Sequence, residues 1–520
     1  MRSAGEQSKL SERDRSILNG LMAMSGQQYP DACRIYAGLT RADSLDFAGW
    51  YGLGECQYLD QQVIPSAESP SRWRFRSSYH QAALYYMRAL RLEPGAHAFF
   101  AFKRLEDLLP TAATQVRQGR GPAPDRMIFA AYPGLVGDSL LFIPYSLSEF
   151  QNLSPRTTNP RQRAALARDA LILREFVNDW TRRAPESADA FEALGQVLEG
   201  AGAPPEIIPG RPTALGALRR ARALSRTPEQ RLRIAAREVW VDFKNSDFGA
   251  ARKLADSTLN EYGRTGTADP RFMIGLAAIT GRLSETGQLA QSSGEWEPAG
   301  ATQLPAAIGT AAGRLFSLAA LGVCGSAFDA AERDLDQKLD SFVADDQKDA
   351  LRTAIKGRPL TMIAPCTNGV SAVRLGSSDS RIARLQQAYA TKDVRRLQAL
   401  LDSSIADLKL RAPADLSFDY TYQLSWLRAV SGDSAGALSQ LERSLNALPS
   451  VSTSSLRQAA SAGAAMRAMV LYANLASRLG RHESAERWAH AVVDLWGGAD
   501  PLLQPTVAQM RNLARIRSSN

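Results

Sequence analysis

The chain has few of the residues that most often bind metals or attack substrates. It contains four cysteines and four histidines in 520 residues. A structural zinc site needs Cys or His ligands clustered at short spacings, such as Cys-x-x-Cys. No such cluster is present, and the sequence predicts no metal site. The histidines are His80, His97, His482 and His490.

One serine lies in a motif with the spacing of a hydrolase nucleophile. The segment Gly432-Asp433-Ser434-Ala435-Gly436 matches G-x-S-x-G. That motif works at a sharp turn from a buried strand into a helix, because the turn exposes the serine hydroxyl. The preceding segment, TYQLSWLRAV, has a helical pattern instead. We therefore predict that Ser434 lies in a turn between two helices.

Two tripeptides have the sequence of protein-kinase motifs but not the order or the flanking motifs that kinases have. They are Asp247-Phe248-Gly249 and the Ala-Ile-Lys sequence that ends at Lys356. In kinases the lysine precedes the DFG aspartate, with a glycine-rich loop before the lysine and an HRD sequence before DFG. Here the order is reversed and both partner motifs are missing. Asp247 is instead predicted to begin a turn between helices.

Neighbouring carboxylates occur along the chain, but on helices such pairs usually face solvent. Phosphate-binding G-x-x-x-x-G-K-[ST] and zinc-binding H-E-x-x-H sequences are missing. We therefore expect no catalytic residue and no cofactor, and predict that the chain is not an enzyme. An enzyme that uses the segment 111–160 remains a weaker alternative. The pairs are Asp334/Asp336, Asp345/Asp346 and Glu106/Asp107.

Composition and charge fit a folded protein and leave nucleic acid as a less favoured partner. The 45% hydrophobic and 22% charged fractions are ordinary for a protein with packed cores. A formal net charge of +9 is the one argument for a nucleic-acid-binding regulator. The basic residues are scattered along the chain, however, so nucleic-acid binding is predicted to be unlikely.

No segment reaches the ~18–20 apolar residues that a membrane-spanning helix needs. The longest candidate, 127–147, is interrupted by Pro133, Gly134, Asp138 and Pro144. The opening residues have no apolar core of a secretion signal. We expect this chain to be soluble as it stands, either in the cytoplasm or as the extracytoplasmic part of a longer membrane-anchored protein.

Small and aromatic residues recur with the spacing of paired helices. The clearest unit runs from GWYGLGECQ to YHQAALYYMRALRLEP. Small residues allow two antiparallel helices to approach closely, aromatic residues fill the gaps between pairs, and a proline ends the second helix. The positions concerned are Trp50, Leu53, Gly54, Ala82, Tyr86, Ala89 and Pro94.

This order resembles the tetratricopeptide repeat, a 34-residue unit of two helices. An earlier copy supports the resemblance, because Gly20 stands 34 residues before Gly54, and Ala32 and Tyr36 repeat the spacing of Ala82 and Tyr86. The resemblance implies an all-α fold, a solenoid of stacked helical hairpins. Further copies are indicated by Phe191/Leu194/Gly195, Ala214/Leu218/Ala221, Phe248/Ala251/Ala255, Gly432/Ala437/Leu441/Pro449 and Gly480/Ala485/Ala489.

Several segments do not fit the repeat. Gly54 and Ala82 are 28 residues apart where the family has 12, so residues 59–75 are predicted to loop out between two paired helices. The segment 111–160 is predicted to hold a strand pair or an ordered loop. Residues 284–310 and 356–380 are rich in Gly, Ser, Thr and Pro and are predicted to be linkers, with a helical hairpin between them.

These patterns predict five regions. Hairpins with a loop insertion occupy 1–110, and an irregular or strand-containing insert occupies 111–160. Middle hairpins follow over 161–283, a helical hairpin with flanking linkers over 284–380, and C-terminal hairpins over 381–520.

The opening of the chain also resembles a more specific group. The segment from SERDRS to WYGLGE is similar to the start of repeat regions that follow bacterial serine/threonine kinases of the eukaryotic-like type. This resemblance implies the sensor or docking part of a bacterial signalling receptor whose kinase domain is absent from this chain, or a stand-alone relative of such a part.

The repeat pattern predicts which cysteines lie on neighbouring helices. Cys33 is predicted on the second helix of the first unit and Cys56 on the first helix of the next, so a disulfide is possible if their Cα atoms lie within ~7 Å. Cys324 and Cys366 are a second possible pair. The alternative is four reduced, buried thiols.

The predicted function is binding of a protein or peptide partner. Stacked hairpins form an extended concave surface, which the first helix of each hairpin lines. The identity of the partner does not follow from the sequence. The candidate groove residues are Tyr51, Glu55, Tyr58, Tyr422, Trp426, Arg467, Asn474 and Arg478.

Overall fold

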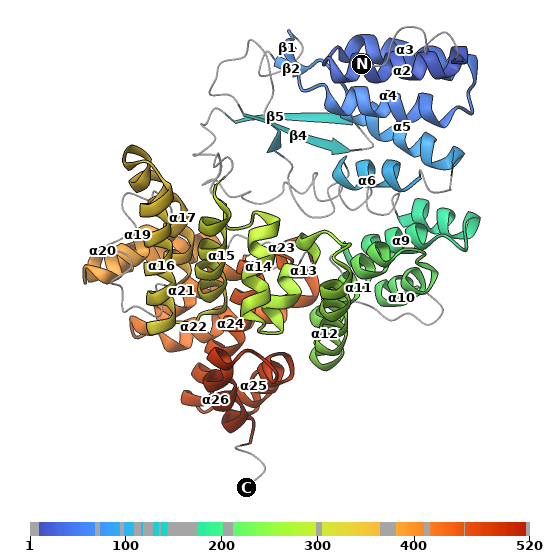
Figure 1. Ribbon diagram of the computed structural model, residues 1–520. Coiled ribbons are helices and arrows are strands. Elements are labelled where there is room, and N and C mark those ends of the chain that lie inside the picture. The colour runs from blue at the N-terminus through green and yellow to red at the C-terminus, as the bar shows by residue number, and fades with distance from the viewer. Residues whose placement is uncertain are drawn as a thin grey trace. The chain divides into compact units, whose positions relative to one another are not determined.

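The computed structural model describes residues 10–67, 73–93, 98–108, 116–117, 128–134, 137–143, 174–200, 212–297, 304–363, 381–409, 417–451 and 453–515. The chain divides into two compact units. The N-terminal unit comprises Met1–Ala201 and Pro212–Leu224, and the C-terminal unit comprises Gly202–Arg211 and Ser225–Asn520. Figure 1 labels their helices and strands.

The N-terminal unit consists mainly of helices in antiparallel pairs. Consecutive helices pack on one another, α2 on α3, α3 on α4, α4 on α5 and α9 on α10. Residues 174–183 are also helical. The helices are α2 (Glu12–Ser25), α3 (Tyr29–Ala42), α4 (Phe47–Leu59), α5 (Tyr79–Leu92), α6 (Ala98–Leu108), α9 (Ala188–Gly200) and α10 (Ala214–Leu224).

The C-terminal unit is helical throughout its described residues. Its longer helices are α11 (Pro228–Lys244), α12 (Phe248–Thr265), α13 (Pro270–Ile279), α14 (Leu283–Ser293), α15 (Ala306–Leu321), α16 (Ser326–Phe342), α17 (Asp345–Ile363), α19 (Arg381–Ala390), α20 (Val394–Lys409), α21 (Phe418–Val430), α22 (Ser434–Asn446), α24 (Ala459–Arg478), α25 (His482–Trp496) and α26 (Gln504–Ala514). Short turns of helix are η3 (Leu448–Ser450), α23 (Thr453–Leu456) and η4 (Pro501–Leu503).

Six hairpins in the described part of the chain share one three-residue turn. Its middle residue has a positive φ, and the next residue donates its backbone N–H to the carbonyl five positions earlier, as Asp433 does to Arg428. This hydrogen bond satisfies a carbonyl that the helix end leaves without a partner. The shared geometry confirms the predicted all-α, tetratricopeptide-like solenoid. The middle residues are Gln27, Ser246, Gly281, Lys392, Gly432 and Gly480.

Strands occur in the two segments where the repeat pattern breaks. Within the loop insertion, β1 (Val63–Pro65) pairs antiparallel with β2 (Trp73–Phe75). Within the predicted strand-containing insert, β4 (Ile128–Gly134) pairs antiparallel with β5 (Gly137–Ile143), with Ile128 opposite Ile143, and β3 (Val116–Arg117) pairs with β4. The predicted strand pair is thus confirmed, and β4 and β5 lie against α5.

Glycines bring the helices of the N-terminal unit into close contact. The ring of Tyr36 on α3 lies between Gly20 of α2 and Gly52 of α4, where a Cβ atom would come within 2.6 and 2.3 Å of the ring. On the other side of α4, Gly54 accepts the ring of Tyr86 in the same way, at 2.5 Å. The predicted pairing of small and aromatic residues therefore packs this unit.

The loop insertion is fastened at the end of α4. The Asp60 carboxylate accepts two hydrogen bonds from Arg76, at 2.7 Å from Nε and 3.0 Å from Nη2. Ser77 Oγ donates to the Asp60 carbonyl at 2.6 Å, and the Ser78 backbone N–H donates to Gln57 at 2.7 Å. Asp60 is 4% exposed whereas the side chain of Arg76 is 38% exposed, so this ion pair lies at the edge of the hairpin and holds the loop to it.

Helix α24 is the centre of the C-terminal unit. It packs against α13 and α15 and against the later hairpin α21–α22, so it joins parts of the chain that are distant in sequence. Fourteen of its 20 residues are buried, and residues 462–469 are buried without interruption. Eight consecutive residues cover more than two helical turns, so no side of this stretch faces water. The first helices α13 and α15 therefore face a helix of the same chain.

Small residues make this packing possible. A Cβ atom on Gly463 of α24 would lie 2.1 Å from the Ala320 carbonyl oxygen of α15. On α13, a Cβ atom on Gly275 would lie 2.5 Å from the carbonyl oxygen of Arg457, just before α24. Real Cβ atoms do not approach backbone this closely, so glycine is required at both positions.

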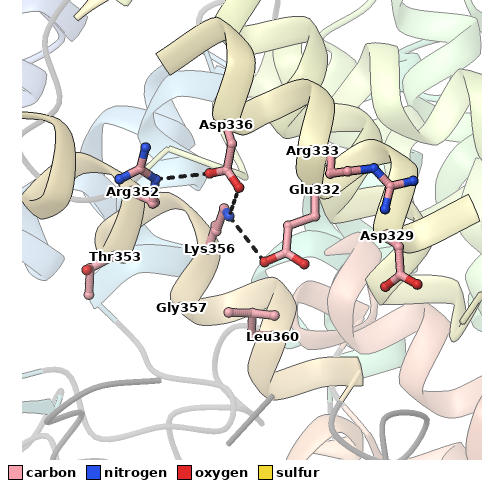
Figure 2. Close-up of a pocket in the computed structure, with 9 residues that line it drawn as sticks. All are labelled: Asp329, Glu332, Arg333, Asp336, Arg352, Thr353, Lys356, Gly357 and Leu360. Carbon is pink, nitrogen blue, oxygen red and sulfur yellow. Dashed lines mark hydrogen bonds and ion pairs between the residues drawn. The ribbon is translucent and has the colours of Figure 1, made fainter. Parts of the chain in front are cut away.

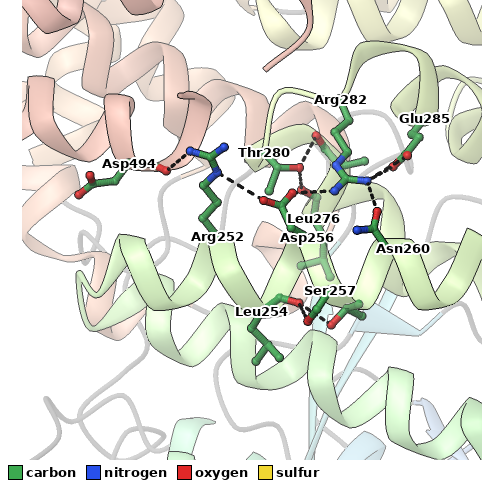
Figure 3. A network of polar contacts seen from close by, with 12 residues as sticks. Arg252, Leu254, Asp256, Ser257, Asn260, Leu276, Thr280, Arg282, Glu285 and Asp494 are labelled. Atoms are coloured by element: carbon green, nitrogen blue, oxygen red, sulfur yellow. Dashed lines mark hydrogen bonds and ion pairs between the residues drawn. The ribbon is translucent and has the colours of Figure 1, made fainter. Parts of the chain in front are cut away.

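Polar contacts join the C-terminal helices to the middle hairpins (Figure 3). Arg252 Nη1 donates to the Asp494 carbonyl at 3.2 Å, and its Nε lies 3.4 Å from Asp256. Asp256 in turn accepts from Arg282 Nη2 at 2.7 Å. The Asp500 carboxylate accepts from the Ser284 backbone N–H at 3.2 Å. These bonds link α12 and α14 to the end of α25.

Glu295 fixes the start of α24. Its carboxylate accepts the backbone N–H groups of Ala459 and Ala460, at 3.1 and 3.3 Å. The first backbone N–H groups of a helix have no partner within the helix, and a carboxylate at this end also interacts favourably with the helix dipole. Glu295 follows α14, so the middle of the chain positions its C-terminal helix.

The structure corrects both predicted linkers. Residues 284–293 form most of α14, and 306–310 begin α15, so the linker over 284–310 is wrong for these residues. Residues 356–363 belong to α17, and 364–380 lie outside the described residues. Serine, threonine and glycine in LSETGQLAQSS are tolerated because Thr286, Gly287 and Leu289 pack against neighbouring helices. The helical hairpin predicted between the linkers is confirmed as α15 and α16.

Among the residues that the structure describes, no helix combines the length and the apolar character needed to cross a bilayer.

Candidate partner-binding surface

The first helices of the N-terminal unit present one continuous face. We define the first-helix face as Leu21 of α2, Tyr51, Glu55 and Tyr58 of α4, and Arg104 of α6. Leu21 stands 34 residues before Glu55, one repeat length, and so occupies the same place on its helix. Tyr51, Glu55 and Tyr58 are spaced four and three residues apart on α4, so these predicted groove residues share one side of that helix.

Glu55 connects three helices at the centre of this face. Its carboxylate accepts a hydrogen bond from the Tyr86 hydroxyl of α5 at 2.9 Å. It also accepts two from Arg104 of α6, at 2.6 Å from Nε and 3.1 Å from Nη2. The side chain of Glu55 is 13% exposed and that of Arg104 is 32% exposed. This bidentate pair orients the arginine toward the accessible side of the face.

Tyrosines surround the ion pair. The Arg104 guanidinium lies 4.9 Å from the centre of the Tyr58 ring, and Tyr51 packs on Tyr86 with 5.6 Å between ring centres. Burial, together with the charge of Glu55, raises the pKa of Tyr51 to about 12. The same two causes raise the pKa of Tyr86 still further. Both hydroxyls therefore stay protonated at neutral pH and serve as donors.

A second polar link extends this surface to α9. Lys103 Nζ donates to Gln196 Oε1 at 2.9 Å, and Gln196 Nε2 donates to Glu192 Oε1 at 3.3 Å. Glu192 is fully buried and Gln196 is 7% exposed. Lys103 is therefore held beside Arg104 by groups on the next first helix.

Apolar contact area on this face comes from α2. Leu21 is 56% exposed and its neighbour Met22 is 58% exposed, whereas Gly20 and Ala23 on the same helix are buried. Neither residue is among the predicted groove residues. The signal was available, because adding the 34-residue repeat length to Leu21 leads to Glu55.

The predicted groove residues of the C-terminal unit lie in different surroundings. Arg467 of α24 is 6% exposed, donates from Nη1 to the Met362 carbonyl at 2.9 Å, and lies 4.6 Å from the centre of the Tyr422 ring. Burial raises the pKa of Tyr422. Placing Arg467 on an accessible groove is thus wrong, because α24 is enclosed by other helices.

The remaining three positions are intermediate or exposed. Trp426 is half-buried and packs edge-on against Tyr389, with 5.3 Å between ring centres. Asn474 is half-buried, and its side-chain carbonyl accepts from Gln509 of α26 at 2.9 Å. Arg478 is exposed at the last residue of α24. Exposure on α24 thus rises toward its end, from the buried Arg467 to the exposed Arg478.

The first predicted cysteine pair is a disulfide. Cys33 of α3 is bonded to Cys56 of α4, with 5.5 Å between their Cα atoms. Cys56 is fully buried, so the bond joins neighbouring hairpins beneath the first-helix face. Cys324 is also disulfide-bonded. Cys366 lies outside the described residues, and its pairing stays a prediction.

The motifs that resemble catalytic sequences serve the fold. Asp433 caps α22 by accepting the Gly436 backbone N–H at 2.8 Å, and Ser434 is the first residue of that helix. Asp247 caps α12 through the Ala250 backbone N–H at 3.1 Å. Both motifs lie where one helix turns into the next, as predicted, but the turns are residues 431–433 and 245–247, so Ser434, Phe248 and Gly249 already belong to helices. Within the described part of the chain, no three His, Cys, Asp or Glu side chains are grouped to hold a metal ion.

A charged cavity of about 780 Å³ lies between α16 and α17 (Figure 2). Lys356 Nζ lies 2.7 Å from Asp336 and 3.1 Å from Glu332, and Arg352 Nε donates to Asp336 at 3.0 Å. Glu332 and Lys356 are 8% and 7% exposed. The cations and carboxylates neutralise one another, which fastens α16 to α17.

Comparisons with known proteins give no family. No protein-family model matches the chain, and no curated protein matches it. Among solved structures, yeast Tom70 aligns over 98% of this chain and 97% of its own, with 11% identity and a TM-score of 0.25. A structure of Naa15/Naa10 bound to HypK aligns over 96% of this chain and 61% of its own, with 12% identity and a TM-score of 0.20.

Likenesses with such low TM-scores carry no argument about this molecule. The fold class rests on the hairpins and their shared turns. The candidate surface rests on the contacts of the first-helix face.

Proposed function

We propose that this chain is a non-catalytic scaffold that binds a protein or peptide partner on the first-helix face of its N-terminal unit. One observation carries the proposal. The first helices α13 and α15 of the C-terminal unit pack against α24, whereas Leu21 of the first helix α2 in the N-terminal unit is 56% exposed.

The composition of the face suits a protein partner. Tyrosine and arginine dominate the energetics of protein interfaces, because both combine apolar contact area with directed hydrogen bonds. Tyr58 and Arg104 are already packed against each other and lose little conformational freedom on binding. Exposed Leu21 supplies apolar area at one end of the face.

The compartment and the signalling role form a finer part of the proposal. A disulfide persists in oxidising surroundings, so the Cys33–Cys56 bond supports an extracytoplasmic location. Together with the likeness of its opening segment to kinase-linked repeat regions, this supports a sensor or docking part of a bacterial signalling system.

Selection of peptides from a random display library, followed by titration against variants, tests the proposal. Leu21→Asp places a charge on the first-helix face, and Tyr58→Ala removes an aromatic contact. Leu84→Asp is a matched control, because Leu84 is 40% exposed on the second helix α5. We expect selected peptides to lose at least roughly tenfold in affinity with the first two variants and to keep it with the control.

Two results would contradict the proposal. One is equal loss of affinity with the Leu84 control, which would place binding elsewhere. The other is retention of random duplex DNA that falls steeply with salt and is unaffected by Leu21→Asp, which would favour a nucleic-acid-binding regulator.

A further inference from the structure

Two ends of hairpins in the C-terminal unit each expose an apolar side chain among charges of a single sign. One is the acidic end, where α16 turns into α17. The other is the basic end, where α19 turns into α20. Their exposed apolar residues are Phe342, at 55%, and Val394, at 73%.

The acidic end comprises Phe342 and the exposed aspartates Asp340, Asp345, Asp346 and Asp349. The segment 340–349 contains these four aspartates and a single lysine, Lys348, for a net charge of −3. Lys348 pairs with Asp345 at 2.7 Å, and Arg352 pairs with Asp340 and Asp349 at 2.9 and 2.8 Å. The negative charge is thus only partly compensated.

The basic end comprises Val394 and the exposed cations Lys392, Arg395 and Arg396. The segment 392–396 contains one carboxylate, Asp393, for a net charge of +2. Asp393 accepts the Arg396 backbone N–H at 3.0 Å and so caps α20. Among the described residues, no ion pair engages the three cationic side chains.

We propose that the acidic end of one copy of this chain binds the basic end of a second copy. An apolar centre within a charged rim is the usual anatomy of a protein interface, and opposite rims attract and orient two partners. Each end carries a net charge that is only partly balanced by its own side chains and that is opposite to the charge of the other end. In the described residues no ion pair joins the two ends within one copy, so both are available to another molecule.

The contact joins two different surfaces and therefore proceeds head to tail, producing either a closed ring or an open chain of copies. It involves the C-terminal unit alone and leaves the first-helix face of the N-terminal unit accessible. Binding of a peptide at that face and self-association can therefore fail independently.

Sedimentation velocity of the full chain over a concentration series tests the proposal. Wild-type protein is expected to self-associate at ~0.1 M salt and to dissociate at ~1 M, where charges are screened within a few ångströms. Asp345→Lys with Asp346→Lys gives two basic ends, and Arg395→Asp with Arg396→Asp gives two acidic ends. Each variant alone is expected to associate at least roughly tenfold more weakly.

Mixing the two charge-reversed variants is the decisive experiment. The mixture restores opposite charges, so association is expected to return only when both variants are present. Glu229→Lys with Glu483→Lys is the matched control, because both glutamates are exposed in the first turn of a helix, as Asp345 and Asp346 are in α17. The control is expected to associate like wild type, with circular dichroism unchanged in all variants.

Three results would overturn the proposal. They are a wild-type monomer throughout the series at low salt, association of either charge-reversed variant equal to wild type, and a mixture that stays monomeric. Binding of duplex DNA at the basic end without self-association would likewise assign that end to another partner.

Discussion

Both units are built from helical hairpins of the same kind, but they differ in how far the first helix of a hairpin is exposed. In the N-terminal unit the first helices carry side chains of graded exposure, from the 56% exposed Leu21 to the 13% exposed Glu55. In the C-terminal unit the first helices α13 and α15 pack against α24. The same architecture can therefore offer a surface to a partner or bury that surface within its own core.

Side-chain size explains the difference. Helix α24 begins AASAGAAMRA, and the facing helix α15 reads AAIGTAAGRLFSLAAL, so two backbones can approach closely. The first helix α4 instead carries tyrosines and a glutamate on its accessible side. Small residues thus favour closure of the solenoid on itself, whereas large amphipathic residues leave room for a ligand.

The largest expected effect comes from adding a methyl group between α24 and α15. Gly463→Ala would place Cβ 2.1 Å from a backbone oxygen of Ala320, and we expect it to destabilise the C-terminal unit by about 3 kcal/mol or more. Chemical denaturation measures the loss. Gly263→Ala in α12 is the control, since nothing lies within 4 Å of its new Cβ and a gain of about 0.5–1 kcal/mol is expected. Equal effects at both positions would mean that α24 does not contact α15.

Removal of the Cys33–Cys56 disulfide is expected to destabilise the N-terminal unit. Cys33→Ala with Cys56→Ala removes a cross-link between residues 23 positions apart. The chain-entropy model of the unfolded state predicts that the N-terminal unit then loses about 3 kcal/mol of stability. Pulse proteolysis in urea, with peptides assigned to each unit by mass spectrometry, would measure it. A loss shared equally by the C-terminal unit would show that the two units do not unfold separately.

A smaller effect, a gain in stability, is expected from substitution by glycine where a hairpin turn holds another residue at positive φ. Ser246 and Lys392 have φ values of 63° and 56°, a region in which glycine is favoured. Ser246→Gly and Lys392→Gly should each stabilise the C-terminal unit by about 0.5–1 kcal/mol in thermal unfolding. Gly432→Ala, at φ 97°, should destabilise it by a similar amount. Reversed signs would contradict the shared turn.

The smallest expected effect is a change of stability with pH that arises from Tyr51 on the first-helix face. Tyr51 has a pKa of about 12 in the folded chain, whereas its ordinary value is 10.0. The unfolded state therefore releases the proton first, and stability should fall as pH rises from 10 to 12. Absorbance titration of wild type against Tyr51→Phe isolates this tyrosine. Ionisation of Tyr51 near pH 10 would place it in water rather than beside Glu55.

Much of the fold follows from the sequence, because helix pairing leaves a local pattern. Gly54 with Tyr86 marks a close contact within one hairpin, Gly432 marks the turn of another, and both hairpins were predicted correctly. The α13–α14 hairpin was missed, since its Ser, Thr and Gly content is typical of linkers. Its Thr280-Gly281 turn has the same form as Ser431-Gly432 and could have revealed it.

The candidate site was predictable only in part. Tyr51, Glu55 and Tyr58 share a face because one helix carries them all. The burial of Arg467 was not predictable, since α24 contacts residues more than 100 positions earlier in the chain, as in the hydrogen bond from Arg467 to the Met362 carbonyl of α17. Contacts over such separations leave no periodic signal in a single sequence.

Oxidation of methionines by peroxide tests the contrast between the two units most directly. Met22 of α2 is 58% exposed, whereas Met466 and Met469 of α24 are fully buried. Peptide mass spectrometry of the native chain should show rapid oxidation of Met22 and protection of Met466 and Met469 until the C-terminal unit unfolds. Oxidation of Met466 and Met469 at the rate of Met22 would contradict the account, because α24 would then lie open to solvent.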